Sequence, residues 1–262
     1  MNYWLGLMAC AICVGSCFGK TIVVTSASGE LGSAVARELA KDHKLILTGR
    51  NMEKLEALKK ELGQGCEVRA LDFTSAESIA AFQVGEVDGL VLIGPRPGFY
   101  GKNMFPQEKE WFEVFKGGFT GPSEVLKNVL SGMQRGGSVV IMAGTTSEQV
   151  QPATGPACVL RRMWTTYSKA LSHELGSQGI RVNALSPGVI STGFHKERIT
   201  NKGKAAGLSY EEQLSKEVVN IPAGRNGEVA EVAKAVRFLV TDESSFINGV
   251  NLVLDGGFTV SY

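Results

Sequence analysis

The segment Thr25–Gly32 has the residue types and spacing that suit binding of a phosphate group. It reads Thr-Ser-Ala-Ser-Gly-Glu-Leu-Gly, between the β-branched run Thr21–Val24 and a helical apolar pattern over Leu31–Leu39. Small residues in a strand-to-helix turn let the backbone approach a pyrophosphate, whose charge is met by N–H groups at the helix N-terminus. The segment therefore predicts a dinucleotide-binding turn. Its expected cofactor-binding residues are Thr25, Ser26, Gly29 and Gly32.

Two residues of this turn depart from the glycine-rich fingerprint of such sites. Ser26 stands where the first glycine is expected, and Glu30 brings a carboxylate close to the phosphate position. A carboxylate beside a pyrophosphate is unfavourable unless it points to solvent, because the two charges repel. The alternative interpretation is an ordinary strand-to-helix turn that needs small residues for packing alone.

The end of the second expected strand indicates which dinucleotide is bound. Thr48-Gly49-Arg50 offers a guanidinium and no carboxylate at that point. NAD sites place an acidic residue there to bind the ribose 2′-hydroxyl, whereas an arginine accepts the 2′-phosphate of NADP. Arg50 therefore favours NADP over NAD as the cofactor. If Arg50 instead pairs with Glu53, the choice stays undecided.

The apolar pattern of the chain supplies a scaffold for these residues. Short β-branched runs alternate with helical patterns, such as the polar-faced helix expected over Asn51–Leu62. Repeated βαβ units predict an α/β fold, with a single doubly wound parallel sheet of about seven strands and helices on both faces. The expected strands are Thr21–Val24, Lys44–Thr48, Glu67–Leu71, Gly89–Ile93, Ser138–Met142, Arg181–Leu185 and Val250–Leu254. No linker divides residues 19–262, so we expect one domain there.

The composition excludes several other functions. The net charge is +1 and no basic stripe is present, so nucleic acid is not an expected partner. Cys10 and Cys13 have a metal-like spacing but lack a second ligand pair or a nearby histidine, so no metal is expected. Cys66 and Cys158 fit ordinary buried thiols.

The N-terminal segment, residues 1–18, stands apart from the expected domain. Tyr3–Phe18 carries no charge and ends in small residues, as a secretory signal or anchor does, but the usual basic residues at the start are missing. The segment is also shorter than the roughly 20 residues of a membrane-spanning helix. A misassigned start and an apolar arm packed on a partner are the alternatives. Without a signal we expect the protein in the cytoplasm. With one it is exported or attached to the membrane, through residues 1–18 only.

The C-terminal half resembles a known enzyme family. Gly136–Gly144 is similar to the fifth strand of short-chain dehydrogenase/reductases, and Gly179–Gly188 to their sixth strand and the following loop. Asn220–Arg225 resembles the segment before the last helix of bacterial 3-oxoacyl-acyl-carrier-protein reductases. The resemblance covers Gly19–Tyr262. It implies a Rossmann-type fold that transfers hydride between a nicotinamide cofactor and a carbonyl or alcohol.

The same resemblance implies further cofactor-binding positions. Asp72, which closes the third expected strand, would lie on the adenine side, although aspartate at a strand end also suits a turn. The remaining positions are Gly94, Arg161, Pro187, Gly188 and Thr192. By the same analogy, the helices that carry Trp111 and Trp164 would join copies of the chain into a homodimer or homotetramer.

The catalytic positions of the family are all substituted. Members of the family use an Asn-Ser-Tyr-Lys relay in which the tyrosine exchanges a proton with the carbonyl oxygen. Counted from either side, the four positions fall on Gly118, Gly144, Ala157 and Arg161. Ala157 cannot transfer a proton. Arg161 stays charged, so it can hold a ribose or a phosphate but is a poor acid.

Other residues offer only partial replacements for this relay. Tyr167-Ser168-Lys169 places its tyrosine and lysine two residues apart instead of four, which puts the side chains on different helical faces. Tyr100 and Thr145 are the other candidates for a replacement acid, and His195 lies in the expected substrate-lid region.

Two hypotheses of function remain. The first is an NADP-linked oxidoreductase that acts on a small-molecule or acyl carbonyl with a relocated or water-borne proton source. The second is a catalytically inactive family member that acts as a dinucleotide sensor or an interaction scaffold.

Overall fold

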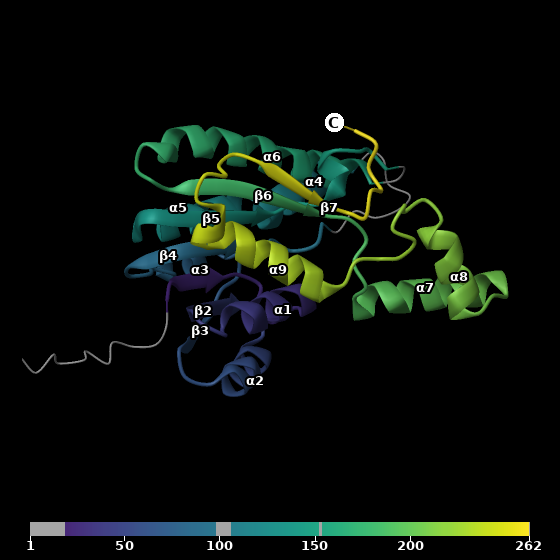
Figure 1. Ribbon diagram of the computed structural model, residues 1–262, viewed down its shortest axis with the longest axis horizontal. Helices are drawn as coiled ribbons and strands as arrows, with labels where there is room; N and C mark the ends of the chain where they lie inside the picture. Colours follow the sequence, from purple (N-terminus) through teal and green to yellow (C-terminus); the bar gives the residue numbers. More distant parts are fainter. Residues whose placement is uncertain (1–18, 98–105, 152–153, 262) are drawn as a thin grey trace, which may run out of the picture.

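Seven parallel strands form the centre of the computed structural model, which describes residues 19–97, 106–151 and 154–261. The strands lie in the order β3-β2-β1-β4-β5-β6-β7 (Figure 1), which confirms the expected doubly wound α/β fold. They are β1 (Thr21–Val24), β2 (Lys44–Gly49), β3 (Cys66–Ala70), β4 (Val87–Leu92), β5 (Met133–Met142), β6 (Arg181–Pro187) and β7 (Asn251–Leu254). The N-terminal segment 1–18 lies outside the described residues, so its expected role stays a prediction.

The start of β5 differs most from the sequence prediction. The strand begins at Met133, not at Ser138, because its pairing with β4 shifts between Val87 opposite Met133 and Gly89 opposite Ser138. The residues between these two pairs carry no β-branched or alternating pattern, so periodicity could not find the strand start. β3 and β4 also begin and end slightly earlier than predicted.

Helices cover both faces of the sheet. Their bounds are α1 (Glu30–Leu39), α2 (Met52–Leu62), α3 (Ala76–Ala81), α4 (Glu108–Phe115), α5 (Gly121–Leu130), α6 (Gly155–Gly176), α7 (Gly193–Ala206), α8 (Tyr210–Val218) and α9 (Val229–Val240). Helices α7 and α8 pack on each other to one side of the sheet (Figure 1). None of the helices in the described part of the chain combines the length and apolar character that a bilayer crossing needs.

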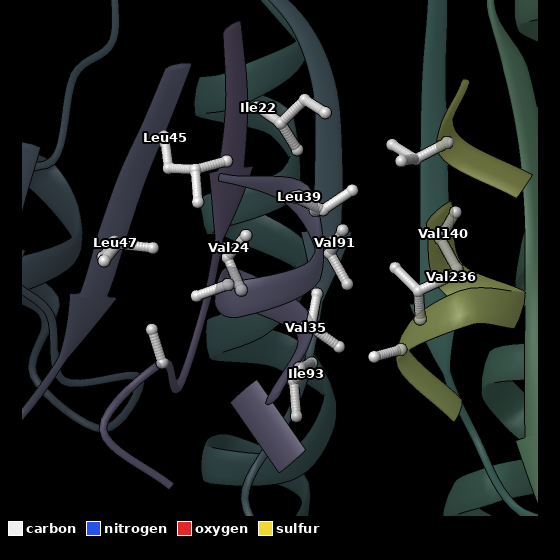
Figure 2. Close-up of a cluster of buried hydrophobic side chains, with 14 of the residues drawn as sticks. Ile22, Val24, Val35, Leu39, Leu45, Leu47, Val91, Ile93, Val140 and Val236 are labelled. Carbon is white, nitrogen blue, oxygen red and sulfur yellow. The ribbon is translucent and has the colours of Figure 1, made fainter. Parts of the chain in front are cut away.

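The core divides into two layers because strand side chains alternate between the faces of the sheet. Ile22 and Val24 point to the face covered by α1 and α9, where Val35 and Leu39 of α1 meet them (Figure 2). Val23, between them in sequence, packs in the opposite layer with residues of α5 and α6. Both layers are mainly apolar, although strands also bury polar side chains such as Ser138 and Asn183, so the sheet is a rigid base for the loops at its carboxyl edge.

The turn from β1 to α1 is the tightest contact between sheet and helix. A Cβ atom at Gly32 would lie 2.4 Å from the carbonyl oxygen of Ser26 and 2.8 Å from the Cα of Ala27. Ser26 itself has a φ of 51°, the only positive φ of a non-glycine residue in the described ranges. The helix can therefore begin this close to the strand only with glycine at position 32.

We expect Gly32→Ala to destabilise the protein by about 2 kcal/mol or more, because the added methyl meets backbone atoms that cannot move aside cheaply. Gly85→Ala is the matched control: a Cβ there meets no atom within 4 Å, and the backbone does not require glycine. Chemical denaturation of both variants measures the difference. Equal stability of the two would contradict this account of the turn.

Candidate functional site

Most of the expected cofactor residues lie at the carboxyl ends of strands, and those of the β1–α1 turn and Gly94 lie beside β1 and β4. β1 pairs with β2 on one side and with β4 on the other, so the chain reverses its direction of winding at this point. In open α/β sheets such a switch point leaves a crevice outside the strand ends. The β1–α1 turn lies at this edge, and the start of α7 is joined to it where the Gly193 N–H donates to the Glu30 carboxylate.

Two polar side chains of the turn are used to hold it in place. The Thr25 hydroxyl donates to the Ile93 carbonyl at 3.0 Å and accepts from the Ile93 N–H at 2.7 Å. The Ser26 hydroxyl donates to the same carbonyl at 2.8 Å. Both predicted cofactor residues therefore lie in the turn as expected, but their hydroxyls join the end of β1 to the end of β4. What the turn offers a ligand is its backbone.

The N-terminus of α1 has the features that suit a phosphate. Gly29 is the N-cap residue, and no side chain caps the first turn of the helix. The first N–H groups of a helix lack partners within the helix, and they carry its positive dipole end. With Gly32 allowing the close approach, the backbone fits a dinucleotide pyrophosphate. Glu30, the first helical residue, is the one group at this end whose charge opposes that fit.

The end of β2 holds the groups expected to select the cofactor. Arg50 is exposed and forms no salt bridge with any described residue, so the alternative pairing with Glu53 is not observed. Asp72 caps its own turn by accepting from the backbone N–H of Thr74 at 2.8 Å and from its hydroxyl at 2.7 Å. These hydrogen bonds lower the pKa of the Asp72 carboxyl. The carboxylate therefore performs the turn role, with one oxygen engaged there.

Four further predicted positions, at the ends of β4 and β6 and at the start of α7, differ in what surrounds them. No atom lies within 4 Å of where a Gly94 Cβ would be, so the end of β4 borders open space. A Cβ at Gly188 would lie 2.7 Å from the Cβ of Asp255, so this glycine serves contact with the segment after β7. Pro187 ends β6 opposite Leu254. Thr192 is the N-cap of α7 and accepts from the His195 N–H at 3.2 Å.

The four positions of the expected proton relay lie around α6: Ala157 and Arg161 belong to this helix, and Gly144 and Gly118 contact its side chains. Gly144 follows β5 with a φ of 148°, and a Cβ there would lie 2.9 Å from the Cζ of Arg161. The Arg161 guanidinium thus occupies the space of a side chain at 144, and its Nη1 donates to the Thr146 hydroxyl at 2.8 Å. Ala157 is fully buried.

The space beside Gly118 is also taken up by a side chain of α6. It lies in a π-helical turn, Lys116–Thr120, between α4 and α5. A Cβ at this glycine would lie 2.6 Å from Cδ2 of Leu160, and its carbonyl accepts from the Trp164 indole N–H at 2.7 Å. The space beside Gly144 and Gly118 is therefore filled by side chains of α6.

The described candidates for a replacement acid lie in different places: Thr145 directly follows Gly144, whereas Tyr167 lies along α6. Tyr167 packs against Phe119 and Trp164, with ring centroids 5.7 and 6.2 Å apart, while Lys169 lies beside Gly249. The two side chains leave α6 on different faces, as their spacing predicts. Thr145 is buried in the short helical turn after β5. Tyr100 lies outside the described residues.

His195 is buried near the start of α7, which sequence reasoning placed in the lid. Its Nε2 lies 3.0 Å from Nδ2 of Asn226, and its Nδ1 lies 3.3 Å from Nη2 of Arg198. A doubly protonated ring would direct its N–H groups at these two donors. Burial first, and then the Arg198 charge, lower the pKa of His195. The ring is therefore buried between the side chains of Asn226 and Arg198 near the start of α7.

The fold and this edge of the sheet define an α/β protein of the dinucleotide-binding class. A family model described as enoyl-(acyl carrier protein) reductase matches residues 26–259. The 3-oxoacyl-[acyl-carrier-protein] reductase of Haemophilus influenzae is 30% identical over 254 residues, which cover 93% of this chain and 99% of that protein. The chain therefore belongs to the short-chain dehydrogenase/reductase family of oxidoreductases.

Solved structures agree with this assignment. Actinorhodin polyketide ketoreductase, crystallised with NADPH, is 28% identical with a TM-score of 0.81, over 92% of this chain and 97% of that one. L-Sorbose reductase from Gluconobacter frateurii, complexed with NADPH and L-sorbose, has a TM-score of 0.85 at 22% identity, over 94% and 98% of the two chains. The second likeness is one of fold.

Because the pKa of His195 is lower in the folded chain than in the unfolded one, the unfolded state gains the proton first as the pH falls. We expect the free energy of unfolding to keep its highest value above about pH 6.5 and to decrease below that pH. His195→Gln removes part of this decrease, and His43, whose pKa burial also lowers, keeps the rest. The exposed His173→Gln is the control. Denaturation curves between about pH 5 and 8, the range in which histidine titrates, measure how the free energy of unfolding depends on pH. An unaltered slope in His195→Gln would disprove this role.

Proposed function

We propose that this protein binds NADP(H) at the carboxyl edge of its sheet and performs no carbonyl reduction there, acting instead as a dinucleotide sensor or interaction scaffold. One observation supports the proposed absence of carbonyl reduction. The Arg161 guanidinium fills the space beside Gly144 and is anchored on Thr146 at 2.8 Å. The reaction centre of the family is thus occupied by the chain's own packing.

The cofactor part of the proposal is supported by the β1–α1 turn. The uncapped N-terminus of α1 and the closeness permitted by Gly32 suit a pyrophosphate. Arg50, exposed and without a salt bridge to a described residue, suits a 2′-phosphate. Two solved structures similar in fold contain NADPH. These features together favour NADP(H) over NAD(H).

The inactivity follows from proton chemistry. When bound, the cofactor supplies hydride to a carbonyl carbon, and the carbonyl oxygen then needs a proton. Ala157 has no proton to give, and a guanidinium such as that of Arg161 keeps its proton across the accessible pH range. Gly144 and Gly118 offer no side chain to orient a substrate or pass a proton. Hydride transfer would therefore lack its acid.

A second candidate function is favoured by the Thr146 hydroxyl. This hydroxyl accepts a hydrogen bond from Arg161, so a cation adjoins a group that can carry a proton. With a relocated relay through such a hydroxyl, or through Thr145 or Tyr100, the protein would be an NADP-linked oxidoreductase of a small-molecule or acyl carbonyl. Aliphatic hydroxyls are weak acids, which places this candidate second.

As a scaffold the protein would act through association. We expect the face of α6 to take part, because Val159 and Tyr167 leave apolar surface exposed there. They line a groove of about 830 Å³ together with Met163 and Phe119. A second copy of the chain is the partner implied by analogy with the family, as a homodimer or homotetramer.

We expect the full chain to bind NADPH, seen as a rise in melting temperature and a change in nicotinamide fluorescence, without oxidising it in the presence of aldehydes, ketones or acyl ketones. The physical reason is the missing proton donor. Absorbance at the nicotinamide band follows turnover. NADPH oxidation that is lost in Tyr100→Phe or in Thr145→Val would overturn the inactive assignment and establish the second candidate.

The preference for NADPH over NADH is expected to depend on Arg50. Arg50→Ala should weaken NADPH binding about tenfold and leave NADH binding unchanged, because only the 2′-phosphate is lost as a partner. Lys60→Ala, an equal loss of charge at the far end of α2, is the control. Parallel fluorescence titrations compare the variants. If both dinucleotides weaken equally in Arg50→Ala, this residue does not read the 2′-phosphate.

A further inference from the structure

The Glu30 carboxylate makes a contact that spans the candidate cofactor site. Glu30 is the first residue of α1, and its two carboxylate oxygens accept from the Gly193 N–H at 2.7 and 3.0 Å. Gly193 is the first residue of α7, so the contact joins segments 163 residues apart in sequence. The side chain stays exposed to solvent. It reaches across to the start of the lid.

The place that this carboxylate occupies is electrostatically suited to an anion. It lies between the N-terminal ends of two helices, where partial positive charge and unpartnered N–H groups are found. At α1 no side chain caps those N–H groups, and at α7 the Gly193 N–H is the one that Glu30 uses. Glu30 thus supplies from within the chain the negative charge that a pyrophosphate would bring.

The local structure is fitted to this contact. A Cβ atom at Gly193 would lie 2.8 Å from Oε1 of Glu30, so a side chain there would push the carboxylate away. The next residue of α7 adds a second connection, since the Arg96 guanidinium lies over the Phe194 ring at 3.9 Å from its centroid. Arg96 follows β4. The start of α7 is therefore attached at two points to the edge where the cofactor is proposed to lie.

We propose that Glu30 is an internal competitor for the cofactor pyrophosphate, which closes the start of α7 onto α1 and limits the affinity of the chain for dinucleotides. This inference rests on the proposed NADP(H)-binding function and specifies how that site is regulated. Binding of the pyrophosphate requires the Glu30–Gly193 contact to open, because two negative charges at this distance repel. Removing the carboxylate lifts both the competition and the repulsion.

Two variants test whether the Glu30 carboxylate competes with the dinucleotide. Glu30→Gln removes the charge, and Glu30→Ala removes the hydrogen-bond acceptor as well. We expect each to bind NADPH about tenfold more tightly than the unmodified protein in a fluorescence titration. Without any dinucleotide, amide hydrogen exchange at residues 193–197 should be faster in Glu30→Ala, because the contact that holds the start of α7 is gone. Gly193→Ala should show the same faster exchange by displacing the carboxylate.

Glu211→Gln is the matched control, since Glu211 is an exposed carboxylate in the first turn of α8. It should leave both readouts unchanged. If the unmodified protein and its variants all bind NADPH equally well, the inference fails and the proposed function stands. If only the Glu30 variants bind, the inference stands and the unmodified chain is not a dinucleotide-binding protein. If neither the unmodified protein nor any variant binds NADPH, both the inference and the proposed function are overturned. Unchanged exchange at residues 193–197 in Glu30→Ala overturns the inference alone.

Discussion

The close approach of α1 to the turn after β1 is the constraint on which the rest of the site depends. Gly32 leaves no room for a side chain against the Ser26 carbonyl, and Ser26 is in turn bonded to the end of β4 through Ile93. This fixes the helix N-terminus at the point where the winding of the sheet reverses. The backbone at the start of α1, which is the group best suited to a pyrophosphate, takes its position from that junction. The hydroxyls of Thr25 and Ser26 contribute to the junction rather than to a ligand.

Packing explains both the sheet and the predicted relay positions. The sheet has a mainly apolar layer on each face. Protein interiors are closely packed, so the space beside a buried glycine is filled by its neighbours. Arg161 takes up the space beside Gly144, and Leu160 takes up the space beside Gly118. At the β1–α1 turn, the Glu30 carboxylate is hydrogen-bonded to the start of α7.

Sequence reasoning located the elements better than it located the contacts of the site. β-branched runs gave β1 and β6 their correct starting residues, because local periodicity and burial coincide there. The start of β5 was wrong, since a shift in pairing with β4 leaves no local pattern. The spacing of Tyr167 and Lys169 was enough to separate their side chains, because helix geometry is local. The pairing of Arg50 with Glu53 remained open in the sequence, and the structure does not contain it.

The amino-acid sequence by itself determined the fold and the family, because both depend on residue types in a fixed order. The loss of the proton relay stays a prediction from the same sequence. The sequence also identified Glu30 as a charge in the wrong place for a phosphate. Only the tertiary structure decided where that charge goes, since its partner Gly193 lies on a different helix. It likewise decided that Arg161 fills the space at Gly144. Contacts between distant segments depend on how sheet and helices pack, and no local pattern of residues encodes them.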